Sequence, residues 1–307
     1  MTTSKSIRKV LLSIAFLIVF SEAGIRLIGL TDFPIYAVNS DIAYIPKPSQ
    51  SGTFLNKNSW VFNDRSMGTV DNWNPAKRSN ILLIGNSIVM GGNPYTQQDK
   101  LGPLIGRELG EDYSVWPIAA GGWTNVNETV YLEKNLDVVN ASNFFIWEYM
   151  SGGLSKLSPS RGEYVFPQEK PTWATWYVLR RYVLPKFIEF NMSELPPTGG
   201  LDKANLAKFE SAIQKLVAAS GKKQPGILFL YPGKSEFIAF KSGVEYLPER
   251  KELERIATLY GLSIVDIAKR PEWNESLYRE GTHPTAEGNA VMARILTSAV
   301  TDAIGPR

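Results

Sequence analysis

Residues 81–88 read ILLIGNSI, in which a short apolar run at 81–84 breaks at a glycine that leads into a serine. A continuous apolar run of this length is typical of a strand buried on both faces of a parallel sheet. Similar runs follow at 114–118, 143–147, 227–231 and 263–267, and apolar residues at helical spacings lie in 101–109, 130–135, 209–217, 253–260 and 291–296. This alternation predicts an α/β fold, a three-layer αβα sandwich with a central parallel sheet of about five strands.

The residues with chemical potential follow the ends of these predicted strands. In an open parallel sheet the site lies beyond the carboxyl ends of the strands, where Ser87 is expected. His283 is the one histidine of the chain, and Glu280 precedes it by three residues. A serine hydroxyl needs a base to become a nucleophile, and an acid behind the imidazole fixes its tautomer. We therefore expect Ser87 as nucleophile, His283 as base and Glu280 as the orienting acid.

Two stretches resemble blocks of a known family, the SGNH or GDSL-type hydrolases. Gly85-Asn86-Ser87-Ile88 is similar to the family's first block, with asparagine in place of the usual aspartate. Glu280-Gly281-Thr282-His283 is similar to its last block, Asp-x-x-His, with glutamate in place of aspartate. The resemblance runs from about residue 79 to the end of the chain. It implies an SGNH or flavodoxin-like sandwich and serine ester hydrolysis.

The resemblance also implies an oxyanion hole, made by the backbone N–H groups of Ser87 and Gly122. The family's third block, Gly-x-Asn-Asp, should follow the third strand, but residues 146–149 read IWEY. Asn125, on the neighbouring loop, is the candidate that replaces the missing side-chain donor. Without a replacement, the loss of one donor costs about a hundredfold in rate.

Three further residues are expected near the substrate. Trp123 and Trp147 flank the predicted site and could stack on sugar faces, although core packing is the more frequent use of tryptophan. Glu148 follows Trp147 and is either structural or a substrate-binding group.

The first 30 residues differ in kind from the rest. Lys5, Arg8 and Lys9 precede an apolar run at 10–20, the layout of an export signal. The chain is either cleaved after Ala23 or held by a retained anchor, which an ion pair of Glu22 and the arginine at position 26 would support. Either outcome places the remainder outside the cytoplasm.

The chain then divides into two further parts. Residues 31–78 predict irregular structure with short strands and a hairpin around 60–63. Residues 79–307 predict the hydrolase-like domain, with an aromatic insertion at about 151–200. The insertion could be a lid, a substrate-binding wall or a membrane-contacting surface, and equally a helical subdomain whose aromatic side chains simply pack.

Composition excludes several function classes. The net charge is +3 and no block of Lys and Arg interleaves with aromatic residues, which argues against nucleic-acid binding. The chain has no cysteine and one histidine. This excludes disulfides and thiolate catalysis and argues against a zinc site. We expect no metal and no dissociable cofactor.

Together, the two motifs and the N-terminal segment favour an extracytoplasmic serine esterase acting on small O-acyl esters. The N-terminal segment and residues 41–68 resemble superfamily members associated with bacterial cell-surface polysaccharides, which implies a glycan substrate. Three alternatives stay open: an O-acetyltransferase that modifies such a polysaccharide, a lipid esterase with the insertion as its lid, and a non-catalytic surface protein with the same fold. The sequence identifies no protein partner and no oligomeric state.

Overall fold

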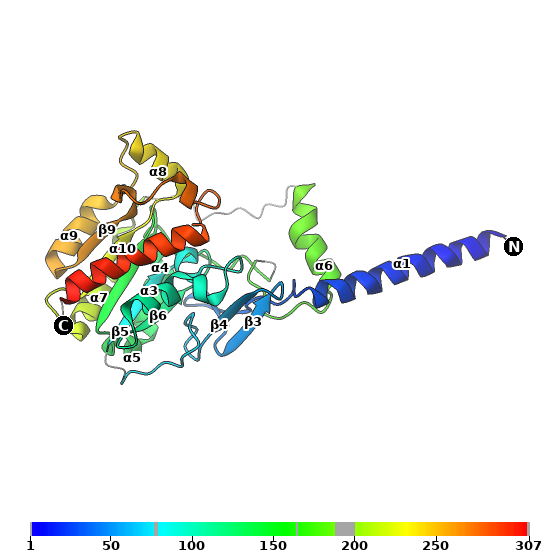
Figure 1. Cartoon of the computed structure of the whole chain (residues 1–307), viewed down its shortest axis with the longest axis horizontal. Coiled ribbons are helices and arrows are strands. Elements are labelled where there is room, and N and C mark those ends of the chain that lie inside the picture. The colour runs from blue at the N-terminus through cyan, green and yellow to red at the C-terminus, as the bar shows by residue number, and fades with distance from the viewer. Residues whose placement is uncertain (1, 77–78, 164, 188–199, 306–307) are drawn as a thin grey trace.

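A parallel five-stranded sheet forms the centre of the molecule. The structure, a computed structural model, describes residues 2–76, 79–163, 165–187 and 200–305 (Figure 1). The strands are β5 (Asn80–Gly85), β6 (Ser114–Ala119), β7 (Phe144–Tyr149), β8 (Gly226–Leu230) and β9 (Ser263–Asp266), in the spatial order β6-β5-β7-β8-β9. Each neighbouring pair is parallel. Every residue of β5, β7 and β8 is buried, as the continuous apolar runs predict.

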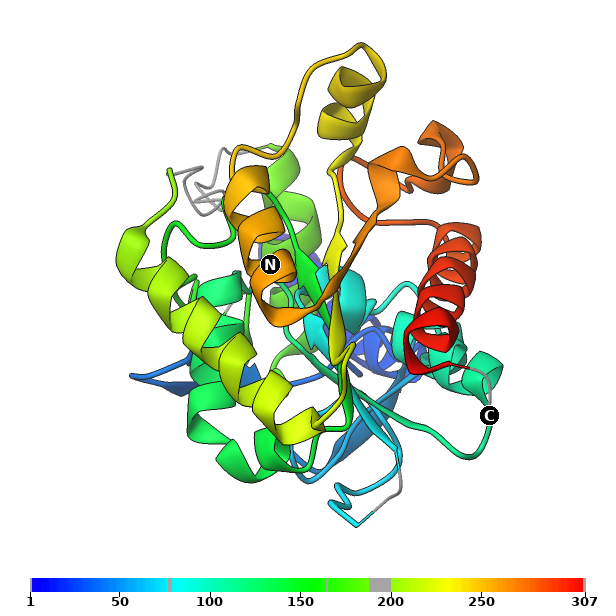
Figure 2. The ribbon, with the colours of Figure 1, turned by 90° about the vertical axis from the view of Figure 1, so that its left-hand side faces the viewer.

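Helices cover both faces of the sheet, so the predicted three-layer sandwich is confirmed. One layer contains α3 (Leu101–Leu109) and α10 (Ala286–Ile304), which contact each other extensively. The other layer contains α4 (Asn125–Lys134), α5 (Leu136–Asn140), α7 (Lys203–Ser220) and α9 (Arg250–Tyr260). Figure 2 looks along the layers and shows the sheet between them. Short elements complete this part: α2 (Ser87–Met90), α8 (Lys234–Lys241) and the 3-10 turns Gln97–Asp99, Ile267–Lys269 and Glu275–Leu277.

Two antiparallel hairpins precede the sandwich. The first joins β1 (Tyr36–Asn39) to β2 (Ala43–Pro46), and the second joins β3 (Gln50–Phe54) to β4 (Asn58–Phe62). The predicted hairpin around 60–63 therefore exists, but those residues form its second strand and the start of the loop beyond. Its turn lies at 55–57, where Leu55 and Asn56 have φ angles of 55° and 52°. Asparagine tolerates this left-handed conformation because its side chain is short and polar.

A long helix, α1 (Thr2–Leu27), projects from the sandwich (Figure 1). Its segment Ser6–Leu27 has a mean hydropathy of 2.0 and is long enough to cross a membrane. The helix ends beside α6 (Ala174–Val178), which a π-helical turn (Leu179–Val183) and a 3-10 turn (Leu184–Lys186) extend. These elements are helical parts of the insertion, and positions 164 and 188–199 of the insertion lie outside the described residues.

Hydrogen bonds join α1 to the insertion. The carboxylate of Glu22 accepts the backbone N–H groups of Ala174 and Thr175 at 3.0 and 2.9 Å. These amides belong to the first turn of α6, whose N–H groups have no partner within the helix. Arg26 donates to the carbonyl oxygen of Thr172 at 2.8 Å, and it forms the expected pair with Glu22.

Candidate active site

Ser87 lies on a tight turn between β5 and α2. The Asn86 side chain accepts the backbone N–H of Ile88 at 3.0 Å and so caps this short helix. Beneath the turn, the backbone N–H of Asn86 donates to Glu148 Oε2 at 3.0 Å. A Cβ atom on Gly85 would lie 2.3 Å from the same oxygen, so only glycine lets the carboxyl group come this close. The strand end and the side chain below it thus fix where Ser87 stands.

The structure brings Ser87, His283 and Glu280 together from positions far apart in sequence. Ser87 Oγ and His283 Nε2 are 2.9 Å apart, within hydrogen-bond distance. On the other side of the ring, His283 Nδ1 contacts Glu280 Oε1. Glu280 also accepts the backbone N–H of His283 at 3.0 Å. One carboxylate therefore fixes both the backbone and the ring of the histidine, and the ring faces the serine.

The loop that carries His283 is tied to the sheet by its backbone. Tyr278 and Pro284 form an isolated antiparallel bridge, and Arg279 N donates to the His283 carbonyl oxygen at 2.9 Å. The Tyr231 hydroxyl, one residue beyond β8, donates to the carbonyl oxygen of Thr282 at 2.7 Å. These contacts place the imidazole at the carboxyl edge of the sheet, where Ser87 also lies.

The surroundings of Glu280 favour its charged form. Burial alone would raise the pKa of this carboxyl group, but hydrogen bonds and charge from His283, with the charge of Arg279, outweigh it. The pKa of Glu280 therefore lies below its ordinary value. An ionised carboxylate at this position stabilises the imidazolium that forms when His283 accepts a proton.

Two backbone N–H groups are available for a developing oxyanion. Ser87, Gly121 and Gly122 line one cavity together with His283. Gly122 has a φ of 77°, a conformation that glycine adopts at little cost. Within the described residues, the N–H groups of Ser87 and Gly122 have no protein acceptor. Both expected backbone donors therefore belong to residues that line the cavity, and neither is engaged by an acceptor in the described part of the chain.

The side chain of Asn125 does not offer a further donor to this cavity. It is 3% exposed, and its Nδ2 donates to Glu128 Oε2 at 2.8 Å and to the carbonyl oxygen of Glu148 at 2.7 Å. The expectation that Asn125 replaces the missing third-block asparagine disagrees with this geometry. Both donor hydrogens of the amide are used on buried acceptors, so none is left for a substrate.

Glu148 is structural in this geometry and offers nothing to a substrate. It is 1% exposed and lies under the Asn86 peptide, with Oε1 lacking any hydrogen-bond partner among the described residues. Burial raises the pKa of Glu148 to about 8, against the lowering effect of hydrogen bonds from Asn86. Burial also raises the pKa of the neighbouring Glu128 well above its ordinary value, with the charge of Glu148 adding to the effect. Near neutral pH Glu148 is therefore largely uncharged, and the environment of Glu128 favours its uncharged form.

The two tryptophans expected to stack on sugars are core residues. Trp147 is fully buried and donates through Nε1 to Glu128 Oε2 at 2.7 Å. Trp123 is 3% exposed and donates to the Tyr44 carbonyl oxygen at 2.8 Å. Neither ring has a free face, so the expectation that they bind a glycan disagrees with the structure.

The cavity at Ser87 is formed largely by residues that the sequence did not single out. Its volume is about 420 Å³. Part of its wall comes from the insertion and the first hairpin region, and this part includes Tyr36, Arg161, Phe166, Tyr177 and Arg181. Arg279, next to Glu280, completes it. The one sequence feature that pointed to this cavity wall was the mixture of aromatic and basic residues in the insertion.

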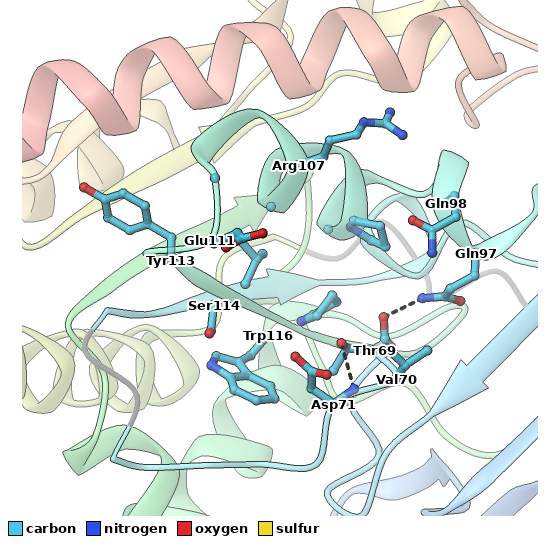
Figure 3. A pocket seen from close by; sticks show the side chains of 17 residues that line it. Thr69, Val70, Asp71, Gln97, Gln98, Arg107, Glu111, Tyr113, Ser114 and Trp116 are labelled. Atoms are coloured by element: carbon cyan, nitrogen blue, oxygen red, sulfur yellow. Dashed lines mark hydrogen bonds between the residues drawn. The ribbon is translucent and has the colours of Figure 1, made fainter.

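A larger cavity, of about 590 Å³, lies between α3, β6 and the segment 68–71 (Figure 3). Its lining includes Asp71, Gln97, Arg107 and Glu111, and neither Ser87 nor His283 contributes to it. Gln97 Nε2 donates a hydrogen bond to the Gly68 carbonyl oxygen at 2.6 Å. Size therefore does not identify the reactive site here, because this cavity lacks a nucleophile paired with a base.

Comparison with known proteins yields matches among solved structures. No family model matches the sequence, and no curated protein sequence matches it. The structure of TesA aligns with a TM-score of 0.47 and 14% identity over 73% of this chain and 99% of that chain. A carbohydrate acetylesterase family member from Sinorhizobium meliloti aligns with a TM-score of 0.43 and 14% identity over 74% of this chain and 100% of its own.

An inhibitor-bound aryl esterase of M. smegmatis aligns with a TM-score of 0.41 and 13% identity, over 73% of this chain and 99% of that chain. The solved structures that this chain resembles thus include esterases. With identities this low, the similarities assign no activity to this chain.

Proposed function

We propose that the protein is a serine esterase of the SGNH type that cleaves small O-acyl esters. The observation that carries the proposal is the chain of contacts from Ser87 Oγ to His283 Nε2, at 2.9 Å, and from His283 Nδ1 to Glu280 Oε1. A hydroxyl, an imidazole and a carboxylate in this order are the parts that nucleophilic acyl transfer requires.

The reaction follows from the roles of these groups. Ser87 Oγ attacks the ester carbonyl carbon while His283 Nε2 takes the hydroxyl proton. The carbonyl oxygen becomes an oxyanion, which the N–H groups of Ser87 and Gly122 stabilise. His283 then gives its proton to the departing alcohol oxygen as the C–O bond breaks, leaving an acyl-enzyme. Water, deprotonated by His283, attacks this intermediate and releases the carboxylic acid and Ser87.

The acyl-enzyme is common to hydrolysis and to transfer onto a sugar hydroxyl. A polysaccharide or another saccharide is the substrate class that the resemblance of the sequence supports. The cavity volume of about 420 Å³ is large enough for a small acyl group together with part of the alcohol.

The protein works from the outer surface of a membrane, with α1 as a retained anchor. Cleavage after Ala23 would remove Glu22, whose carboxylate accepts the first two backbone N–H groups of α6. It would leave those N–H groups without their partner. Exposed aromatic side chains of the insertion, including Trp173 at 59% and Trp176 at 50%, lie close to the end of α1. Tryptophan side chains beside the end of a membrane-spanning helix are typical of a membrane interface.

The experiment that tests the function compares the full-length chain with its Ser87→Ala and His283→Ala variants on p-nitrophenyl acetate. We expect each variant to lose at least about a thousandfold in kcat. Free acetate is measured with and without an added oligosaccharide, because an acyl acceptor would lower acetate release without slowing the loss of ester. Activity that survives both substitutions would show that the esterase assignment is mistaken.

A further inference from the structure

Positive charge surrounds the cavity that contains Ser87 and His283. Arg161, Arg181 and Arg279 all line it. No aspartate or glutamate is among its described lining residues. The carboxylate nearest to the site, Glu280, is already bound to His283 and lies 3.8 Å from Arg279. The cavity therefore presents an excess of guanidinium groups that a neutral ester would not need.

Arg161 is the most informative of the three. Its Nε is buried and has no hydrogen-bond partner among the described residues. This nitrogen is out of reach of a ligand, but Arg161 also lines the cavity, so the part of its guanidinium group that faces the cavity is where a ligand oxygen would bind. A Cβ atom on Gly122 would lie 3.1 Å from Arg161 Nη2. The guanidinium thus stands beside the loop that offers the second oxyanion donor, close to where an ester would be held.

Aromatic rings hold all three guanidinium groups in place. Arg161 lies 5.4 Å from the centroid of the Phe166 ring, and that ring stacks on Tyr44 at 3.8 Å. Arg181 lies 5.8 Å from the ring of Tyr177, and Arg279 lies 5.7 Å from the ring of Tyr95. Cation–π contacts orient an arginine without neutralising its charge. Arg161 forms no ion pair with a described carboxylate, whereas Arg279 lies 3.8 Å from Glu280.

We propose that the alcohol part of the substrate is an acidic saccharide, whose carboxylate or phosphate is bound by Arg161 with the support of Arg181 and Arg279. This inference rests on the proposed esterase function and adds a substrate class to it. Arginine presents a planar fork of N–H donors that matches both anionic groups. The acidic group is assigned to the saccharide because the saccharide is the alcohol part of the proposed ester.

The test uses two matched substrates, methyl 3-O-acetyl-glucuronoside and methyl 3-O-acetyl-glucoside, with the full-length chain. They differ only in a carboxylate against a hydroxymethyl group. We expect kcat/KM to favour the glucuronoside by about tenfold or more, chiefly through KM. A third substrate, methyl 3-O-acetyl-glucoside 6-phosphate, separates the two anions: a larger ratio for the phosphate assigns the site to phosphosugars, and a larger ratio for the carboxylate assigns it to uronates.

Substitution of Arg161 tests whether this residue causes the preference for the acidic substrate. Arg161→Gln should lower the ratio of acidic to neutral substrate by about tenfold, whereas Arg161→Lys should restore part of it. Arg107→Gln, which removes one charge at the other cavity (Figure 3), should leave the ratio unchanged. Equal rates on acidic and neutral esters in the unmodified protein would overturn the proposal. Equal losses on both esters in Arg161→Gln would also overturn it, since they would show that Arg161 serves the ester group itself.

A binding measurement keeps this inference separate from the catalytic one. Calorimetry with the Ser87→Ala variant compares methyl glucuronoside with methyl glucoside, and it requires no turnover. Tighter binding of the glucuronoside would support the acidic-saccharide site even if ester hydrolysis were not found. Failure to bind either sugar, in a protein that hydrolyses p-nitrophenyl acetate, would leave the esterase standing and reject the substrate class.

Discussion

Ser87 and His283 are held by the ends of buried strands, whereas Arg161 and Arg181 face them from an insertion that rests on α1. The catalytic side is fixed by β5, β7 and the loop that Tyr231 anchors beyond β8. The insertion is held by polar and aromatic contacts, among them those of Glu22 with the first turn of α6 and the stacking of Phe166 on Tyr44. We infer that one region determines the reaction and the other determines which substrate is bound. Substitutions in each region test this.

The largest expected effect concerns the catalytic side. Glu280→Gln keeps the size of the side chain but removes the charge that stabilises an imidazolium on His283. We expect kcat on p-nitrophenyl acetate to fall by about a hundredfold to ten-thousandfold. Glu287→Gln, an exposed acid at the start of α10, is the matched control and should retain its rate. A Glu280→Gln variant as fast as the control would mean that the carboxylate does not orient the base.

The support beneath Ser87 predicts a change in stability. In Gly85→Ala, the new Cβ would meet Glu148 Oε2 at 2.3 Å and the Val89 side chain at 2.6 Å. Overpacking of this kind should cost about 3 kcal/mol, seen as a fall in Tm of about 8 °C. Gly106→Ala is the control, because its Cβ has no contact closer than 3.7 Å and alanine favours the helix α3. Equal Tm values for the two variants would show that Glu148 does not crowd the strand end.

The raised pKa of Glu148 predicts how stability depends on pH. Because burial raises this pKa from 4.5 to about 8, the unfolded chain releases a proton near pH 4.5 that the folded chain keeps until about pH 8. Stability should therefore fall as pH rises from about 5 to 8 and level off above that. Glu148→Gln removes this dependence, so its advantage in Tm over the unmodified protein should grow across the interval by about 5 °C. Parallel Tm curves, like those expected for the exposed control Glu108→Gln, would contradict the assignment.

The smallest effect is expected on the insertion. Glu22→Gln weakens the cap that α1 gives to α6 and removes the ion pair with Arg26, a change of about 1 kcal/mol. Hydrogen exchange at the amides of Ala174 and Thr175 should become about fivefold faster, while the rate on p-nitrophenyl acetate stays the same. Glu169→Gln, an exposed acid of the same insertion, should leave these amides as protected as before. Unchanged exchange in Glu22→Gln would mean that α1 does not support the wall of the cavity.

Much of the fold could be predicted because its strands are short, apolar and buried on both faces. Local polar contacts were harder to foresee. The helix expected at 130–135 begins at Asn125, since Thr124 and Asn127 form a capping box that the apolar pattern does not reveal. The short helix α8 was missed, because Phe237 is its one buried residue and a 3.6-residue pattern needs several.

The site could be predicted only where a motif fixes the backbone. Ser87 follows a strand end and His283 precedes a helix, so topology alone brings them to one edge of the sheet. Trp147 and Glu148 occupy neighbouring positions of β7, where both faces are covered by helices, and neither side chain can reach a substrate. Arg161 and Arg181 could not be located from the sequence. Their positions depend on how the insertion packs against α1 and the hairpins.

The central claim is that Ser87 is a nucleophile activated by His283, and covalent labelling tests it most directly. The full-length protein is treated with a fluorophosphonate, and the modified peptide is identified by mass spectrometry. We expect one adduct, on Ser87, formed at least about a hundredfold more slowly in His283→Ala. Labelling of another residue, or equal labelling rates with and without the imidazole, would contradict the account.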